Sequence, residues 1–196
     1  QFGPVYTGDT VFGFFSAESL AQQVGVRGAV PYQPTEAEVS RGERFDYPAE
    51  APFPEQQLRM IDQIDLLVAD GGPDGLGFIR GSKEVDPKEW FFDAHFYQDP
   101  VCPGSLGLES FLQLLKVVAF QRWGGQAESV FETMALGEEQ HWNYRGQIIP
   151  SNKQVTVEAV VTSIDDERKL LKANGFLSVD GKVIYQMKAF SIRFSP

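Results

Sequence analysis

The 196-residue chain contains a single cysteine, Cys102, so it cannot form an internal disulfide. Such cysteine usage fits a reducing compartment, and we expect a cytoplasmic location. No apolar run approaches the ~20 residues that a helix needs to cross a bilayer, so no membrane partner is expected. The first residues, "QFGPVYTGDT", carry no basic-then-apolar signal pattern and resemble a processed or excised end.

Positive charge is also scarce. The chain has 17 Lys and Arg against 27 Asp and Glu, a net charge of −10. Binding to nucleic acid needs a basic face that neutralises phosphates, so this class of partner is excluded. Two histidines, His95 and His141, have no carboxylates at ligand spacing, which argues against a metal site. The glycines at 71–77 lack a following helix with Lys-Ser/Thr, so phosphate binding is not expected.

What is present is globular: 42% of the residues are hydrophobic and 13% are aromatic, as in one ordinary domain. Residues 4–15 alternate and predict a strand, and Ser16 starts a short helix to about residue 24. Residues 25–56 are rich in proline and are typical of a linker or of a loop that wraps around the domain. We therefore expect an N-terminal strand, helix and linker at 1–56 and a compact domain at 57–196.

One weak internal repeat joins the two ends of the chain. The segments "VYTGDTVFGFF" (5–15) and "IYQMKAFSIRF" (184–194) share an apolar-Tyr start and later aromatic residues. The first segment is then the last strand of a preceding, similar domain. Alternatively, the two are unrelated aromatic strands, and the pattern does not choose between these interpretations.

The compact domain predicts an α+β fold. Two strands flank a Gly/Pro/Asp turn at 70–77, and a helix over 105–122 ends at the glycine pair 124–125. An antiparallel meander follows over 129–194, with Asp180 and Gly181 as a tight hairpin turn. One long helix followed by a run of strands indicates a sheet wrapped around that helix.

The segment 90–113, "WFFDAHFYQDPVCPGSLGLESFLQ", contains the candidate site. The apolar residues of the helix that follows point in nearly every direction, so the helix should be buried on most sides. A glutamate there, Glu109, loses solvation, which favours its protonated, proton-donating form. Gln113 lies one turn later and is placed to orient it. Glu109 is thus a candidate general acid.

The start of this helix, at Pro103, Gly104 and Ser105, leaves amide groups without internal acceptors. Gly104 has no Cβ and admits a ligand close to the backbone, about 7.5 Å along the axis from Glu109. Free amides at the positive end of a helix suit a carbonyl oxygen that gains negative charge. His95 follows the aromatic segment "WFF", which we expect to end a strand, and its imidazole is a candidate base.

A base, an oxyanion donor and a buried acid suit the dehydration of a 3-hydroxyacyl thioester. Each residue also has an ordinary structural interpretation. The histidine can be a hydrogen-bonded core residue, the glutamate a solvated one, Pro-Gly a simple turn and Ser105 a helix cap. Only the joint spacing of the three groups favours the catalytic interpretation.

The segment "HFYQDPVCPGSLGLESFLQ" (95–113) resembles the active-site segment of FabA/FabZ-type 3-hydroxyacyl-[acyl-carrier-protein] dehydratases. The resemblance is stronger for the FabA-like dehydratase domains of polyunsaturated fatty acid synthases and iterative polyketide synthases, and it covers about residues 57–196. The segments that carry it further are "LRMIDQI" (58–64), "WNYRGQIIP" (142–150) and "VDGKVIYQMKAFSIRF" (179–194).

The resemblance implies a hot-dog fold that pairs with a second hot-dog, as a homodimer or in tandem. It implies His95 as the base, the Gly104 N–H as the donor to the thioester carbonyl, and Glu109 as the acid facing the partner's histidine. It also implies a cis peptide at His95–Phe96 and no cofactor. The implied substrate contacts come from five residues: Phe96, Cys102, Pro103, Ser105 and Gln113.

The implied substrate is an acyl chain linked by phosphopantetheine to an acyl carrier protein. Arg168 and Lys169 match a basic pair for carrier docking, but acidic residues at 165–167 precede them. Docking in trans should therefore be weak, and tethering in one polypeptide would offset this through effective concentration.

Two departures from the family pattern concern the reaction product and the length of the acyl chain. Glu109 stands where FabA enzymes have Asp, which puts double-bond isomerisation in question. Cys102 replaces a common Met and alters the volume near the acyl site. The alternative functions are a non-catalytic hot-dog that binds acyl chains or only dimerises, and a thioester hydrolase, for which no water-activating group is evident.

Overall fold

The structure is a computed structural model that describes Gly3, Gly8 and residues 16–196. The helices are α1 (Ala17–Ala21), α2 (Glu36–Arg41), η1 (a 3₁₀ turn, Gln56–Leu58), α3 (Trp90–Ala94) and α4 (Gly104–Trp123). The strands are β1 (Glu43–Asp46), β2 (Gln63–Val68), β3 (Phe78–Glu84), β4 (Val130–Thr133), β5 (His141–Tyr144), β6 (Gln154–Asp165), β7 (Leu170–Val179) and β8 (Lys182–Ser195).

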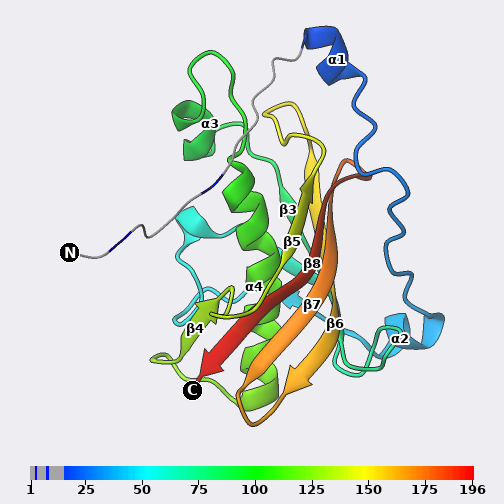
Figure 1. Cartoon of the computed structure of the whole chain (residues 1–196), viewed down its shortest axis with the longest axis vertical. Coiled ribbons are helices and arrows are strands. Elements are labelled where there is room, and N and C mark those ends of the chain that lie inside the picture. Colours follow the sequence, from blue (N-terminus) through cyan, green and yellow to red (C-terminus); the bar gives the residue numbers. More distant parts are fainter. Residues whose placement is uncertain (1–2, 4–7, 9–15) are drawn as a thin grey trace.

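The strands form one antiparallel sheet in the order β1-β2-β3-β6-β7-β8, with β4 and β5 both paired to β8 at the far edge. The sheet curves around α4, which runs along its concave side (Figure 1). The α+β class and the sheet wrapped around one long helix are thus confirmed. This is the arrangement expected of a hot-dog fold.

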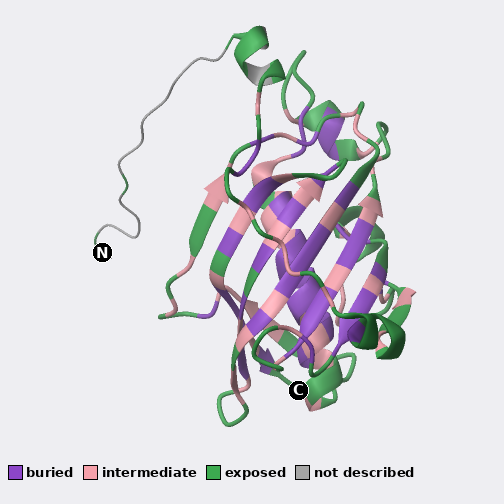
Figure 2. Cartoon of the chain, turned by 90° about the vertical axis from the view of Figure 1, so that its right-hand side faces the viewer, coloured by how far each residue is buried: buried purple, intermediate pink, exposed green. Residues whose placement is uncertain are grey.

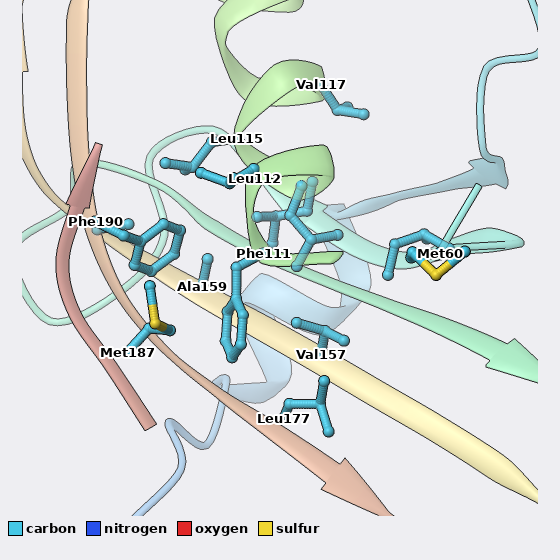
Figure 3. Packing of buried hydrophobic residues seen from close by; sticks show 14 of the residues in the cluster. Met60, Phe111, Leu112, Leu115, Val117, Val157, Ala159, Leu177, Met187 and Phe190 are labelled. Atoms are coloured by element: carbon cyan, nitrogen blue, oxygen red, sulfur yellow. The ribbon is translucent and has the colours of Figure 1, made fainter. Parts of the chain in front are cut away.

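The core forms between α4 and the long strands. Phe111, Leu114 and Leu115 of α4 are fully buried. Figure 3 shows Phe111 among Val157 and Ala159 of β6, Leu177 of β7, and Met187 and Phe190 of β8. Burial of each large apolar side chain contributes about 1.5–3 kcal/mol, so this packing fixes the helix against the sheet.

Both predicted turn signals are confirmed. Asp180 and Gly181 have φ of 49° and 80° at the β7–β8 hairpin, which is the positive-φ pair that a type I′ turn requires. Gly124 ends α4 with φ of 69°, and its N–H donates to the Phe120 carbonyl at 3.0 Å. The helix therefore begins and ends within one residue of the predicted limits.

The prediction that residues 25–56 form a linker is wrong in part, because α2 and β1 lie within this segment. Thr35 and Glu38 form a capping box that starts α2. Strand β1 pairs with β2 as an edge of the sheet, and Tyr47 after it is only 2% exposed. The prolines flank these elements and do not interrupt them, so proline content alone misled the prediction.

Two further local predictions need correction. The segment "WFF" does not end a strand: Trp90–Ala94 forms the short helix α3, in which Phe91 and Phe92 are buried. The predicted strand at 129–142 is split into β4 and β5, because residues 134–140 loop out opposite only 189–191 of β8. Met134 and Gly137 have positive φ in this loop.

Some predictions fall on residues outside the described part of the chain, namely the strand at 4–15 and the internal repeat that rests on it. The short helix after Ser16 is present as α1, and the Ser16 hydroxyl accepts from the Ser19 N–H at 3.1 Å. In the described part of the chain, no helix combines the length and apolarity needed to span a membrane.

Candidate active site

His95 lies directly after α3 and is tied on both sides to Val101. Its Nδ1 lies 2.9 Å from the Val101 carbonyl oxygen, and its own carbonyl accepts from the Val101 N–H at 2.8 Å. An Nδ1–H that donates to a carbonyl leaves Nε2 unprotonated in the neutral ring. Nε2 makes no hydrogen bond within the described residues, so it is available to accept a proton.

The turn after His95 is open and aromatic. The His95–Phe96 peptide bond is cis, as the resemblance implies. The Phe96 ring lies 3.7 Å from the imidazole, centroid to centroid, and Phe96 and Tyr97 are 58% and 89% exposed. Phe96 therefore contacts the candidate base directly and leaves one face of its ring in solvent.

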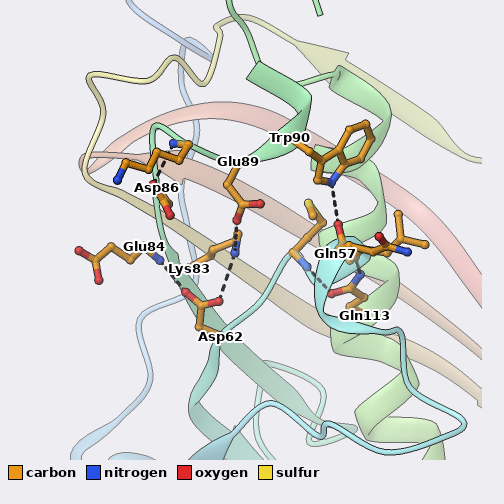
Figure 4. A network of polar contacts seen from close by, with 11 residues as sticks. Gln57, Asp62, Lys83, Glu84, Asp86, Glu89, Trp90 and Gln113 are labelled. Carbon is orange, nitrogen blue, oxygen red and sulfur yellow. Dashed lines mark hydrogen bonds and ion pairs between the residues drawn. The ribbon is translucent and has the colours of Figure 1, made fainter. Parts of the chain in front are cut away.

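Helix α3, which carries this turn, is held by polar contacts at its start (Figure 4). The Trp90 Nε1–H donates to the Gln57 carbonyl at 2.8 Å. Lys83 of β3 pairs with Glu89 at 2.9 Å and with Asp62 at 3.2 Å. These contacts attach the base-carrying segment to β3 and to η1.

The start of α4 has the geometry expected from the sequence. Pro103 is the N-cap residue and provides no side-chain cap. Within the described residues, the N–H groups of Gly104 and Ser105 have no acceptor. A Cβ at Gly104 would lie 3.0 Å from Cη2 of Trp142. The indole ring of Trp142 therefore lies beside Gly104 and leaves less room for a ligand to approach these amides.

Glu109 projects from the next turn of α4, and two donors share one of its oxygens. Gln113 Nε2 lies 3.3 Å and Lys116 Nζ 2.7 Å from Oε1. Oε2 makes no hydrogen bond within the described residues. The carboxyl group is therefore held through Oε1, and Oε2 remains free to contact a ligand.

Gln113 is itself held at both ends of its fully buried amide. Its Oε1 accepts from the Met60 N–H at 2.8 Å, and its Nε2 donates to the Leu58 carbonyl at 2.9 Å (Figure 4). The segment 57–60 thus contacts both the acid side, through Gln113, and the base side, through Trp90. This bridging segment did not emerge from the sequence.

Lys116 was also not predicted from the sequence. It lies seven residues after Glu109, and this spacing of two helical turns was the available signal. Tyr47 lies close by and donates to the Gln113 backbone carbonyl at 3.2 Å. Burial raises the pKa of Tyr47, and the nearby Glu109 charge raises this pKa further, so Tyr47 stays a neutral donor.

Cys102 lines a small apolar cavity between α3 and α4. The cavity has a volume of about 30 Å³ and is bordered by Phe91, Phe92, Leu106, Ile148 and Leu177 among others. This space holds about one water molecule, so it admits an acyl chain only after side chains move. Burial raises the pKa of the Cys102 thiol to about 12, so the thiol stays neutral.

The structure does not bring all the expected residues together within one chain. No hydrogen bond or ion pair joins His95 to Glu109, although both were placed in one reaction. Lys169 lies over Trp123, the last residue of α4, with Nζ 5.5 Å from the ring centroid. Because α4 is about 30 Å long, the pair Arg168 and Lys169 lies far from Gly104 of the same chain.

The described residues contain no group of His, Cys, Asp or Glu side chains arranged to hold a metal ion. His141 is exposed and lies 3.5 Å from Glu139 on β5 and the loop before it.

Comparisons with known proteins show the family to which the chain belongs. A family model described as a FabA-like domain matches residues 53–188. One of the polyunsaturated fatty acid synthase subunits of Thraustochytrium sp. is 35% identical over 215 aligned positions, which cover 97% of this chain and 14% of that protein. The chain thus spans a small part of that relative's length.

Solved structures show the same fold. The dehydratase heterocomplex ApeI:P from Xenorhabdus doucetiae matches 84% of this chain and 93% of its own with a TM-score of 0.52 and 15% identity. A mutant thioesterase from Pseudomonas aeruginosa covers 61% of this chain and 75% of its own at 16% identity, but its TM-score of 0.42 is too low to support an argument. The structural likeness supports the hot-dog fold.

Proposed function

Because the chain belongs to the FabA-like domain family, we propose that it dehydrates 3-hydroxyacyl thioesters to trans-2-enoyl thioesters. The single observation that carries this proposal is the set of free atoms at the site. His95 Nε2, the Gly104 N–H and Glu109 Oε2 are each without a partner in the described residues, while neighbouring atoms of the two side chains are fixed by hydrogen bonds. Each of the three groups proposed as base, oxyanion donor and acid therefore has an atom that is free to act on a substrate.

The reaction would use each group once. His95 Nε2 takes a proton from C2 of the substrate, and the charge that moves to the thioester oxygen is stabilised by the Gly104 N–H. The C3–O bond then breaks, and the Glu109 carboxyl protonates the leaving hydroxyl to give water. The proton on His95 returns to Glu109 before the next turnover, so the net products are the enoyl thioester and water.

The site is complete only if a second hot-dog contributes. His95 and Glu109 of one chain make no hydrogen bond to each other, whereas pairing of two copies through the β4–β5 edge would bring another surface to this face. Val130, Leu136 and Trp142 on this edge are 61%, 81% and 42% exposed. We propose a homodimer, with a neighbouring hot-dog domain of a longer polypeptide as the alternative partner.

The substrate is proposed to be presented on an acyl carrier protein in a cytoplasmic fatty acid or polyketide synthase. This rests on the 35% identity to part of a synthase. Arg168 is exposed but lies 3.8 Å from Glu138, and Asp166 pairs with Arg122 at 2.7 Å. Docking by Arg168 and Lys169 therefore stays a prediction, and double-bond isomerisation, which Glu109 puts in question, stays an open alternative.

Hydration of a trans-2-enoyl thioester, the reverse reaction, tests the proposal. We expect activity in the unaltered chain, and a decrease in turnover of at least ~100-fold in His95→Ala and in Glu109→Gln. Circular dichroism should show that both variants keep the fold. An unaltered chain without hydratase activity that still binds acyl thioesters would support a non-catalytic hot-dog. Full activity in either variant would remove the role assigned to that residue.

A further inference from the structure

Within the described residues, Lys116 is the one charged side chain that pairs with the candidate acid. Its Nζ lies 2.7 Å from Glu109 Oε1, and the two side chains are 13% and 28% exposed. Side chains on a helix lean toward its N-terminus, so Lys116 reaches back over two turns to Glu109. A partly buried ion pair of this kind is screened less by solvent than a surface pair, and its geometry is better defined.

The direction of the two donors has a chemical consequence. Gln113 and Lys116 both donate to Oε1, and neither contacts Oε2. An oxygen that accepts two hydrogen bonds from N–H donors cannot also carry a proton in the same plane without losing one of them. When the carboxyl group is protonated, the proton is therefore directed to Oε2, the atom that has no partner in the described part of the chain.

Lys116 also faces the charge that appears during the reaction. As Glu109 gives its proton to the leaving hydroxyl, negative charge develops on the carboxyl group, and the ammonium lies within hydrogen-bonding distance of it. A fixed cation at this position is stabilising where charge develops. Two further groups are linked to this carboxyl by charge: the charge of Glu109 raises the pKa of the buried Tyr47, and the charge of Arg59 opposes this rise.

We infer that Lys116 is a positioning residue that, with Gln113, holds Glu109 through Oε1 and directs its acidic proton to Oε2. This rests on the proposed function, in which Glu109 is the acid. Lys116 touches no reacting atom and acts through the carboxyl group alone. Its effect should therefore disappear when Glu109 can no longer donate a proton.

The test is a double-mutant cycle in the hydration assay with Lys116→Met and Glu109→Gln. Lys116→Met should lower kcat about 10-fold and change KM less than about 2-fold, because orientation of the acid is lost while substrate contacts remain. Lys116→Arg, which still donates to Oε1, should restore most of kcat. In the Glu109→Gln background, Lys116→Met should have no further effect.

A control is Arg41→Met, which removes the ion pair between Arg41 of α2 and Asp70 at 3.0 Å, away from the site and from the β4–β5 edge. It should leave kcat unchanged, and its melting temperature reports the cost of losing an ion pair as such. If Lys116→Met does not fold, Lys116→Gln replaces it in the cycle.

Three outcomes are informative. An unchanged kcat in Lys116→Met, or an equal loss in the Glu109→Gln background, overturns the inference and leaves the proposed function intact. No activity in the unaltered chain overturns the proposed function and the inference with it. Loss of kcat, rescue by arginine and no loss in the double variant together establish the positioning role.

Discussion

The acid side and the base side of the site are built differently. Glu109 lies on α4, a 20-residue helix with many buried residues. In Figure 2, buried residues also run along the strands of the sheet around this helix. His95 lies on a turn after a five-residue helix, with exposed aromatic residues on its other side. The acid is thus fixed by a long core helix, whereas the base is fixed by a short helix with two buried aromatic residues and by a few individual hydrogen bonds.

This difference has an energetic meaning. Displacing α4 would expose many apolar side chains at about 1.5–3 kcal/mol each, so the acid side moves only when the domain unfolds. In α3 only Phe91 and Phe92 are buried in this way, and the polar contacts of Val101, Trp90 and Glu89 contribute on the order of 1 kcal/mol each. Local opening should therefore begin at 90–101 and not at α4.

Among changes to the supporting contacts, the largest effect on stability is expected from Gln113→Leu, which removes contacts on the acid side. The leucine would leave the Met60 N–H and the Leu58 carbonyl without their partner and remove one donor from Glu109. We expect a loss of about 2–3 kcal/mol in the free energy of unfolding, measured with urea, and a decrease in kcat of at least ~10-fold.

The control for this prediction is Gln121→Leu, which makes the same change at an exposed position of α4. It should change the free energy of unfolding by less than about 0.5 kcal/mol and leave kcat unchanged. If the two leucine variants behaved alike, the acid side would not be held through Gln113.

A smaller effect is expected from Trp90→Phe on the base side. It removes the hydrogen bond from Nε1 to the Gln57 carbonyl at a position that is 46% exposed. We expect a stability loss of about 1 kcal/mol and a decrease in kcat of about 3-fold, because α3 and His95 shift slightly.

Trp123→Phe provides the comparison for Trp90→Phe. It removes a similar bond, from Nε1 to Asp166 at 2.8 Å, at the opposite end of α4. Its stability loss should be comparable, but kcat should not change. A decrease in kcat in Trp123→Phe would mean that activity follows stability alone and that the base side has no special sensitivity.

The same contrast explains what the sequence could predict. The limits of α4, its burial and the free amides at Gly104 follow from apolar periodicity, a Pro-Gly start and a glycine end, which are local signals. Helix α3 was mistaken for a strand because "WFF" has high β propensity, and tertiary contacts of Phe91 and Phe92 decide its conformation. The β propensity of individual residues is a weak predictor of conformation in so short a segment.

Contacts between distant segments had no signal in the sequence. The bonds from 57–60 to Trp90 and Gln113 join residues 33 to 55 positions apart. Lys116 is an intermediate case, because its spacing from Glu109 was visible but lysines at that spacing are usually solvated. The role of His95 came from its motif, whereas the atom that is free to act became evident only from the bond to Val101.

The central claim is that the two sides act together across two copies of the chain, and mixing two inactive variants tests it most directly. Equal amounts of His95→Ala and Glu109→Gln chains, unfolded together and refolded, should regain about a quarter of the unaltered activity, because about half the dimers are mixed and each has one intact site. Native mass spectrometry should verify the mixed dimers. Mixed dimers without activity would contradict a site shared between copies.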